Sequence, residues 1–440
     1  MISFLSDFAE LRECGPEWLQ DLRQNALNRF EALGFPTPRD EEWKYTNVTP
    51  LSRQEFRSTN SQKTPQTAVS SRGEEALQAS VIESLVGPRL VFVDGIFSAA
   101  LSRVENLPKD VELRNFASAL QDSPSLKRRL AAEAKFDDES FVALNTAFMH
   151  EGLYAYVPRG VTLAEPVHVL FVSTGDEPPH VTHPRHLIVT EDNAQLTLIE
   201  DYVGLGDAKY WTNAVTEVFT EPGSIVDHYK LVRESDEAFH VSNLCVRQSR
   251  ESKFHSSALS FGGALVRNNV NVVMDDEGVE CTLNGLTTIG GRQHVDNHTR
   301  IVHAKPRCNS WEVYKNILSD RATGVFNGKI YVNEDAQKTD AKQTNQTLLL
   351  SDSAVMNTKP ELEIYADDVK CTHGATIGQL DKDALFYLKA RGVGAEAARA
   401  LLTYAFAGDV VDSIRVDALR RTVQGLMLSK LPEQYALETT

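Results

Sequence analysis

The sequence predicts a mainly β protein, in which a β-solenoid core is flanked by helical segments at both ends. Three observations lead to this prediction. From Leu153 to about Ile377, short apolar or alternating runs follow one another with almost no helical period. Polar turns separate these runs, at first about every 30 residues and later more closely, which indicates an irregular repeat. Apolar stripes of helical spacing lie before and after this region.

The number of strands favours a solenoid over other β architectures. More than 200 residues of successive strands are too many for one open twisted sheet, which curls or splits at that size. A large sandwich, a propeller and a solenoid remain. Propellers usually carry one motif per blade, and the sequence shows none. A solenoid buries apolar residues inside each coil and pairs each coil with the next, so it fits best.

Residues 1–85 are expected to form a helical N-terminal domain with a polar linker. Pro16 suits the first turn of a helix, and Gly34 is well placed to end it. Residues 58–73 are rich in Ser, Thr and Gln, which predicts a linker or mobile loop. The apolar stripe of the helix consists of Trp18, Leu22, Ala26, Phe30 and Leu33.

The predicted core spans residues 86–378, and a helical C-terminal domain spans residues 379–440. The core begins with a strand at Leu90–Val93 and contains a helix at about 123–135, with Ser123 as its N-cap. A short helix at Asp381–Arg391 follows the core. Two further helices are predicted from apolar stripes, one formed by Ala398, Leu401, Leu402, Ala405 and Phe406, the other by Val416, Leu419, Val423, Leu426 and Met427.

Composition excludes several classes of protein. The formal net charge of −16 argues against nucleic-acid binding, which needs a basic face. The first residues lack the pattern of an ordinary secretory signal, and no apolar run is long enough to span a membrane. The five cysteines are scattered and form no CxxC pair, so they are not a disulfide framework. A reducing, cytoplasmic location is therefore predicted.

The stretch Asp367–Thr376 carries the best candidate site. In an extended strand Cys371 and His373 lie on one face. A soft sulfur and an imidazole nitrogen suit iron or an iron–sulfur cluster. Two ligands are too few, so a complete site needs others from elsewhere, such as another chain. The spacing taken alone favours a second interpretation, in which both residues belong to the apolar inner face.

Other candidates have structural alternatives. Cys281 alternates with apolar residues and fits the core, whereas Cys308 is either structural or a thiol in a basic setting. Asp296 and His298 either bind a metal with Gln293 or form a turn. The segment Gly324–Ile330 is similar to a phosphate loop, but it has one residue too few and no Ser or Thr after the lysine. No ATP site is therefore expected in this chain.

Several longer motifs resemble the SufB/SufD family of iron–sulfur cluster assembly proteins. The similarity extends over nearly the whole chain. Only Cys14 lies in the first 240 residues, whereas SufB proteins often carry an N-terminal cysteine cluster, so the SufD branch resembles this chain more closely than the SufB branch. The motifs are Glu41–Thr46, Ala143–Phe148, Gly324–Ile330, Asp335–Ala341, Gln343–Ser351, Asn357–Ile364, Asp367–Thr376, Phe386–Leu388 and Arg391–Gly392.

The resemblance implies a right-handed parallel β-helix with helical N- and C-terminal domains. It implies a non-catalytic scaffold subunit that pairs with SufB through the β-helices and binds the ATPase SufC through its C-terminal helices. A nascent iron–sulfur cluster would be held transiently with SufB and passed to acceptor proteins. His373 matches the candidate iron or cluster ligand of the family, acting with a cysteine from SufB, and the role of Cys371 is less settled.

Three alternatives remain open from the sequence. The first is the sister subunit SufB. The second is a β-helix carbohydrate-active enzyme, since an acidic chain offers many carboxylates for a groove. The third is a purely structural partner in which Cys371 and His373 are core residues. A homodimer in the absence of SufB is also compatible, because the edge of a β-helix invites pairing.

Overall fold

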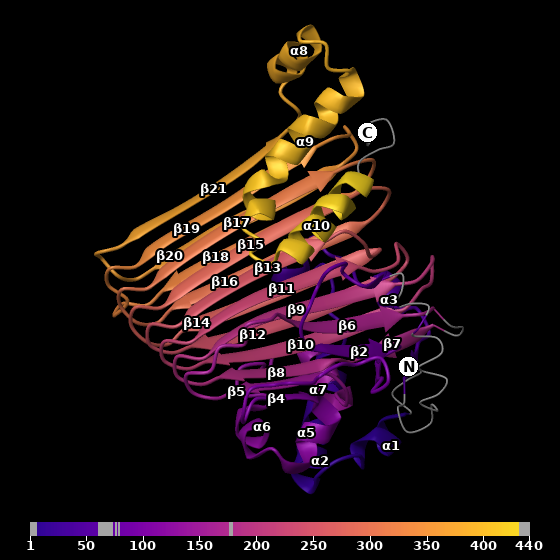
Figure 1. Cartoon of the computed structure of the whole chain (residues 1–440), viewed down its shortest axis with the longest axis vertical. Coiled ribbons are helices and arrows are strands. Elements are labelled where there is room, and N and C mark those ends of the chain that lie inside the picture. Colours follow the sequence, from indigo (N-terminus) through magenta and orange to yellow (C-terminus); the bar gives the residue numbers. More distant parts are fainter. Residues whose placement is uncertain (1–6, 60–73, 75–76, 78–79, 176–178, 431–440) are drawn as a thin grey trace.

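The computed structural model describes residues 7–59, 74, 77, 80–175 and 179–430, and these form a parallel β-solenoid of about eight turns. Helices lie at both ends of the chain (Figure 1). The predicted fold class, a mainly β solenoid with helical N- and C-terminal segments, is confirmed. Most of the predicted linker, from residue 60 to residue 73, lies outside the described residues.

Each coil gives one strand to each of two facing sheets. The strands of both sheets are parallel, except for the pairs β2–β3 and β4–β5. The first sheet contains β4 (Glu112–Asn115), β5 (Leu153–Val157), β8 (Arg185–Thr190), β10 (Trp211–Thr220), β12 (Phe239–Gln248), β14 (Leu265–Met274), β16 (His294–His303), β18 (Thr323–Val332) and β20 (Val355–Ile364), with β1 (Arg57–Ser58) and β7 (His180–Thr182) beside them. The second sheet contains β3 (Ile96–Phe97), β2 (Arg89–Val93), β6 (Val167–Ser173), β9 (Gln195–Gly204), β11 (Ile225–Arg233), β13 (Lys253–Ser260), β15 (Glu280–Ile289), β17 (Asn309–Leu318), β19 (Asp340–Leu349) and β21 (Lys370–Gly378).

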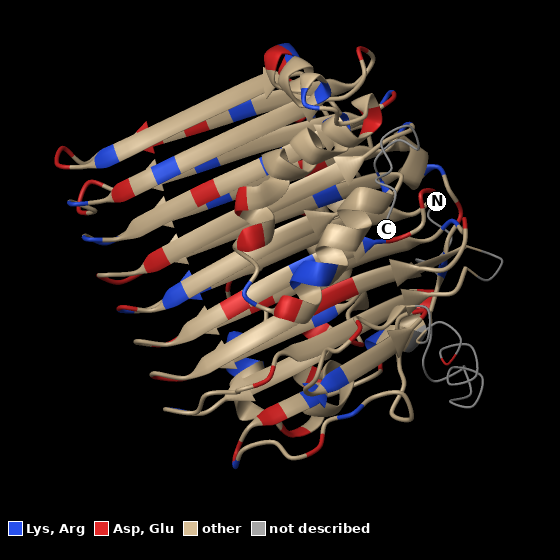
Figure 2. Ribbon diagram, turned by 45° about the horizontal axis from the view of Figure 1, so that its top comes forward, with Lys and Arg blue, Asp and Glu red and all other residues tan. Residues whose placement is uncertain are grey.

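One corner of the solenoid repeats the same backbone turn from coil to coil. A residue of positive φ stands there, and its N–H donates to a carbonyl of the next coil. Examples are Asn193 to Pro222 (2.9 Å), Glu251 to Glu277 (3.0 Å) and Arg307 to Gln337 (2.9 Å). These bonds satisfy turn backbone that would otherwise be unpaired. Many of the charged residues lie at such turns, while much of the length of the strands is uncharged (Figure 2).

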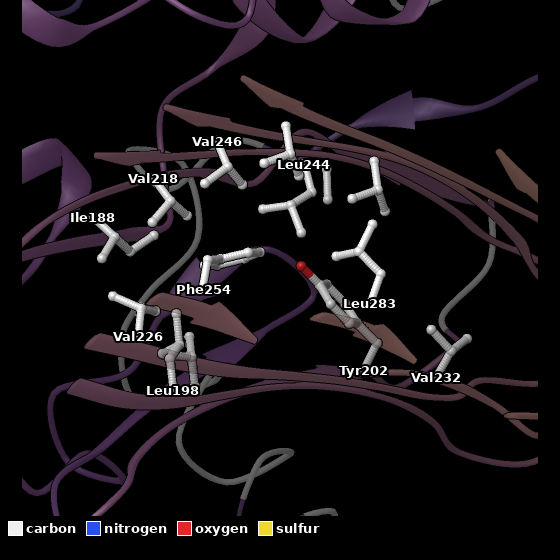
Figure 3. Close-up of a cluster of buried hydrophobic side chains, with 14 of the residues drawn as sticks. Ile188, Leu198, Tyr202, Val218, Val226, Val232, Leu244, Val246, Phe254 and Leu283 are labelled. Carbon is white, nitrogen blue, oxygen red and sulfur yellow. The ribbon is translucent and has the colours of Figure 1, made fainter. Parts of the chain in front are cut away.

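The interior of the solenoid is an apolar core with a polar strip. Side chains of alternate residues point inward from both sheets, and Leu198, Phe254 and Leu283 pack there (Figure 3). The hydroxyl of Tyr202 also lies among them. The alternating apolar pattern of the sequence predicted these inward-facing positions.

The N-terminal helices pack on the outer face of the first sheet. Aromatic rings of Trp43, Phe141 and Trp211 join the helices to strand β10, with centroid separations of 5.1 Å and 6.0 Å. Ser123 caps its helix as predicted, because its Oγ accepts from the N–H of Leu126 (3.3 Å). The helices are α1 (Phe8–Arg12), α2 (Glu17–Leu33), the 3₁₀ helix η2 (Glu41–Trp43), α3 (Thr49–Ser52), α5 (Phe116–Asp122), α6 (Pro124–Arg129) and α7 (Ser140–Phe148).

The C-terminal helices are α8 (Lys382–Ala390), α9 (Ala395–Asp412) and α10 (Asp417–Ser429), and α9 and α10 cover the outer face of the second sheet (Figure 1). The stripe predicted for α10 is confirmed for Leu419, Val423 and Met427, which are buried. Of the stripe predicted for α9, only Ala398 is buried, and the rest of the prediction is wrong. Its Leu401 is exposed, and the buried face consists of Ala398, Ala400, Thr403, Ala407, Val410 and Val411. The division of the chain at residues 85 and 378 stays a prediction.

Candidate functional site

Cys371 and His373 lie on β21, the last strand of the second sheet. In the parallel pairing with β19, Cys371 is opposite Ala341 and His373 is opposite Gln343. Ala341 and Gln343 are buried inside the solenoid, and paired residues of adjacent strands share a face. Cys371 and His373 therefore stand on the inner face of the final coil, as the period of two predicted. His373 is nevertheless exposed and Cys371 is half-buried.

His373 is exposed because the solenoid is open at this end. Strand β21 pairs with β19 and strand β20 with β18, and within the described residues neither has a second neighbour in its sheet. Almost every residue of β21 is exposed, in contrast to the buried strands in the middle of the solenoid. Large apolar side chains are also exposed in this part of the chain, namely Val355, Ile364, Tyr365 and Ile377. The end combines two uncovered sheet edges with apolar surface.

The thiol of Cys371 has a raised pKa. Its burial raises its pKa, and the neighbouring charge of Asp340 raises that pKa further. The side chain packs against a small buried cluster that includes Ala341 and Ile330. Since a metal ligand must be the thiolate, binding at Cys371 would release a proton.

A buried carboxyl and a buried amide lie beneath His373. Glu312 of β17, Gln343 of β19 and His373 of β21 occupy equivalent positions in three successive coils. The Nε2 of Gln343 donates to the Oε2 of Glu312 at 2.7 Å. Burial raises the pKa of Glu312 to about 7. The Oε1 of Gln343 is buried and has no hydrogen-bond partner within the described part of the chain.

The remaining candidates from the sequence are buried or take part in ion pairs. Cys281 and Cys308 are completely buried. Asp296 accepts from the guanidinium of Arg267 and the hydroxyl of Thr46, and it lies 3.1 Å from the Nε2 of His298. This network attaches the Glu41–Thr46 motif to the first sheet. In the described residues no group of three or more His, Cys, Asp or Glu side chains is arranged to hold a metal ion.

The segment that is similar to a phosphate loop forms strand β18. Lys329 of this strand pairs with Glu363 at 2.5 Å. A Cβ at Gly324 would lie 2.7 Å from the sulfur of Met356, and one at Gly328 would lie 2.2 Å from the Nε2 of Gln343. The glycines therefore make room for inward-facing side chains, and the segment has no loop geometry that could hold a phosphate.

Sequence reasoning missed a strip of buried polar side chains inside the solenoid. Glu200 accepts from the hydroxyls of Tyr202 (2.9 Å) and Thr216 (2.8 Å). Lys230 donates to the Oδ1 of Asn268 (2.8 Å), and burial lowers the pKa of its amine to about 7. The sequence signal for this strip was the presence of charged residues at inward-facing positions of strands with alternating apolar residues. Without the pairing register, that signal does not show which of these residues contact one another.

Comparison with known proteins shows which family the chain is similar to. Residues 171–406 match the family described as "SUF system FeS cluster assembly, SufBD core domain", and residues 4–169 match the "SufBD protein N-terminal region". The iron–sulfur cluster assembly protein SufD of Escherichia coli is 32% identical, over 93% of this chain and 92% of its own length. An iron–sulfur cluster assembly SufBD family protein of Synechocystis is also 32% identical, over 91% and 89%. SufD of Bacillus subtilis is 25% identical over 97% of both chains.

The solenoid and these matches define a protein of iron–sulfur cluster assembly. The chain belongs to the SufBD family. The resemblance predicted from its motifs is thereby confirmed, including the similarity to SufD. No helix in the described residues is long and apolar enough to cross a membrane.

Proposed function

We propose that this chain is a non-catalytic scaffold subunit, which assembles nascent iron–sulfur clusters together with SufB and the ATPase SufC in the cytoplasm. One observation carries the proposal. His373 and Cys371 stand on the last strand of the solenoid, where His373 is exposed at an open sheet edge. Two ligands are too few for a cluster, and an open edge is where another chain can add the rest.

The open end supports pairing with SufB. The outer backbone groups of β20 and β21 can pair with strands of another chain, as exposed sheet edges commonly do. The exposed Tyr365 and Ile377 add apolar surface to such an interface. A site formed across it would bring a cysteine of SufB close to His373. The same edges would permit a homodimer when SufB is absent.

The C-terminal helices support binding of SufC. Helix α8 has no buried residue, and its Phe386 and Tyr387 are exposed by 73% and 58%. Aromatic residues of this kind are enriched at protein interfaces. In this proposal SufC provides ATP hydrolysis. The segment of this chain that is similar to a phosphate loop, Gly324–Ile330, forms part of strand β18 instead.

The substitution His373→Ala tests the proposal. We expect the variant to assemble with SufB and SufC but to lose most of its cluster, at least fivefold in iron and sulfide, because one ligand is missing. The measurement is anaerobic reconstitution of the complex, followed by iron and sulfide analysis and visible absorption. Gel filtration checks that the complex is intact.

Thr372→Ala is the matched control, because Thr372 is an exposed neighbour on the opposite face of β21. It should retain normal cluster content. If an intact His373→Ala complex holds as much iron and sulfide as the wild type, His373 is no ligand and the proposal fails.

A further inference from the structure

Gln343 is a buried amide that lies directly beneath His373 in the strand register. The side chain is 1% exposed, and its Nε2 is held by Glu312 at 2.7 Å. Its other polar atom, Oε1, has no hydrogen-bond partner among the described residues. A buried amide oxygen without a partner costs free energy, so such an atom calls for an explanation.

The residue in register on the uncovered side of Gln343 is His373. Adjacent parallel strands are separated by about 4.8 Å, and their paired side chains project from the same face. An imidazole N–H of His373 is therefore within reach of the Oε1 of Gln343 after a side-chain rotation. Among the residues that the structure describes, no other side chain lies in register with Gln343 on that side, because β21 is the last strand of its sheet.

We infer that Gln343, anchored by Glu312, is a positioning residue that accepts a hydrogen bond from one ring nitrogen of His373 and directs the other nitrogen toward the cluster. This inference rests on the proposed function of His373. Histidines that ligate metals usually donate their second N–H to a fixed acceptor, which sets the tautomer and the ring orientation. A chain of carboxylate, amide and imidazole in three successive coils provides such an acceptor.

Gly328 supports this arrangement from the opposite sheet. A Cβ at this position would lie 2.2 Å from the Nε2 and 2.7 Å from the Cδ of Gln343, and 2.8 Å from the ring of Phe326. The absence of a side chain thus leaves space for the amide at the place where it meets Glu312. The substitution Gly328→Ala would push the amide out of this place.

The first test uses the isolated full-length chain labelled with ¹⁵N-histidine. The ring nitrogen signals of His373 are identified by their loss in His373→Ala. We expect one dominant tautomer in the wild type and a mixture of tautomers in Gln343→Leu, which removes the acceptor but keeps the volume. The control is Asn345→Leu. Asn345 is also a buried inward-facing amide of β19, but its partner in β21 is Ala375. It should leave the His373 signals unchanged.

The second test is the rate of cluster formation with Fe²⁺ and sulfide in the reconstituted complex with SufB and SufC. Gln343→Leu should slow it about 10-fold, the lower end of typical effects of such partners. Gly328→Ala should act in the same direction, and Asn345→Leu should not. If the His373 signals are the same in the wild type and in folded Gln343→Leu, the inference is wrong, even where His373→Ala abolishes the cluster. Normal cluster content in His373→Ala would instead contradict the proposed function, so the two failures are distinguishable.

Discussion

Replacing Arg185 with Met is expected to lower the free energy of unfolding by about 3–5 kcal/mol, because it leaves a buried carboxylate without its positively charged partner. Arg185 and Glu217 are both completely buried, and their closest atoms are 2.6 Å apart. Arg185 also donates to Asn145 (3.2 Å) and Thr146 (3.1 Å) of helix α7. Urea denaturation of the isolated chain, followed by circular dichroism, measures the loss.

Arg159→Met is the matched control for this prediction. Arg159 pairs with Asp192 at 2.5 Å, but its side chain is 77% exposed. Exposed ion pairs contribute at most about 1 kcal/mol, so the same substitution should change stability little here. Equal, small losses in both variants would contradict the idea that the buried pair holds α7 on the first sheet.

The Arg185 network also explains the structural role of a motif whose role could not be inferred from the sequence. The sequence marked Ala143–Phe148 as typical of the family, but nothing in it indicates what Asn145 does. In the structure its Nδ2 donates to the carbonyls of Pro184 (2.9 Å) and Asn213 (2.8 Å), which lie in two successive coils. The motif therefore attaches a helix to the solenoid. Such contacts join residues far apart in sequence, and local patterns do not show them.

The architecture was predictable because it follows local rules. Inward and outward positions alternate along each strand, and this alternation indicated both the solenoid and the shared face of Cys371 and His373. The face of α9 was not predictable in the same way. This helix carries small and apolar residues on all its sides, so several apolar stripes are possible. Packing on β15 and β17 selects the stripe with Ala407 and Val411.

The residues that support the site, Glu312 and Gln343, could not be predicted from the sequence for a different reason. Glu312 is 31 residues before Gln343, and Gln343 is 30 residues before His373. Their alignment depends on the length of each coil, which varies with its turns. A shift of one residue in one turn would place them on opposite faces. Only the register of the finished solenoid brings them into one column.

The second large effect concerns the pH dependence of stability. It also tests the column formed by Glu312, Gln343 and His373. Glu312→Gln should leave stability nearly unchanged at pH 5 and raise it by about 2–3 kcal/mol at pH 8. The pKa of Glu312 is about 7 in the folded chain and near 4.5 when the chain is unfolded. Stability contributed by the protonated carboxyl is complete below about pH 4.5 and is lost as the pH rises through 7. Glutamine resembles the protonated form and cannot ionise, so it escapes this loss.

Urea denaturation of both proteins at pH 5, 6, 7 and 8 measures this difference. Glu280→Gln, at the partly exposed beginning of β15, is the control, and its effect should vary with pH by less than about 0.5 kcal/mol. A pH-independent effect of Glu312→Gln would mean that burial does not disfavour the ionised carboxylate. Gln343 would then be held by an ionised acceptor throughout the physiological range. The predicted dependence means instead that the anchor of Gln343 gains its charge near neutral pH, so that the amide beneath His373 is held most strongly above pH 7.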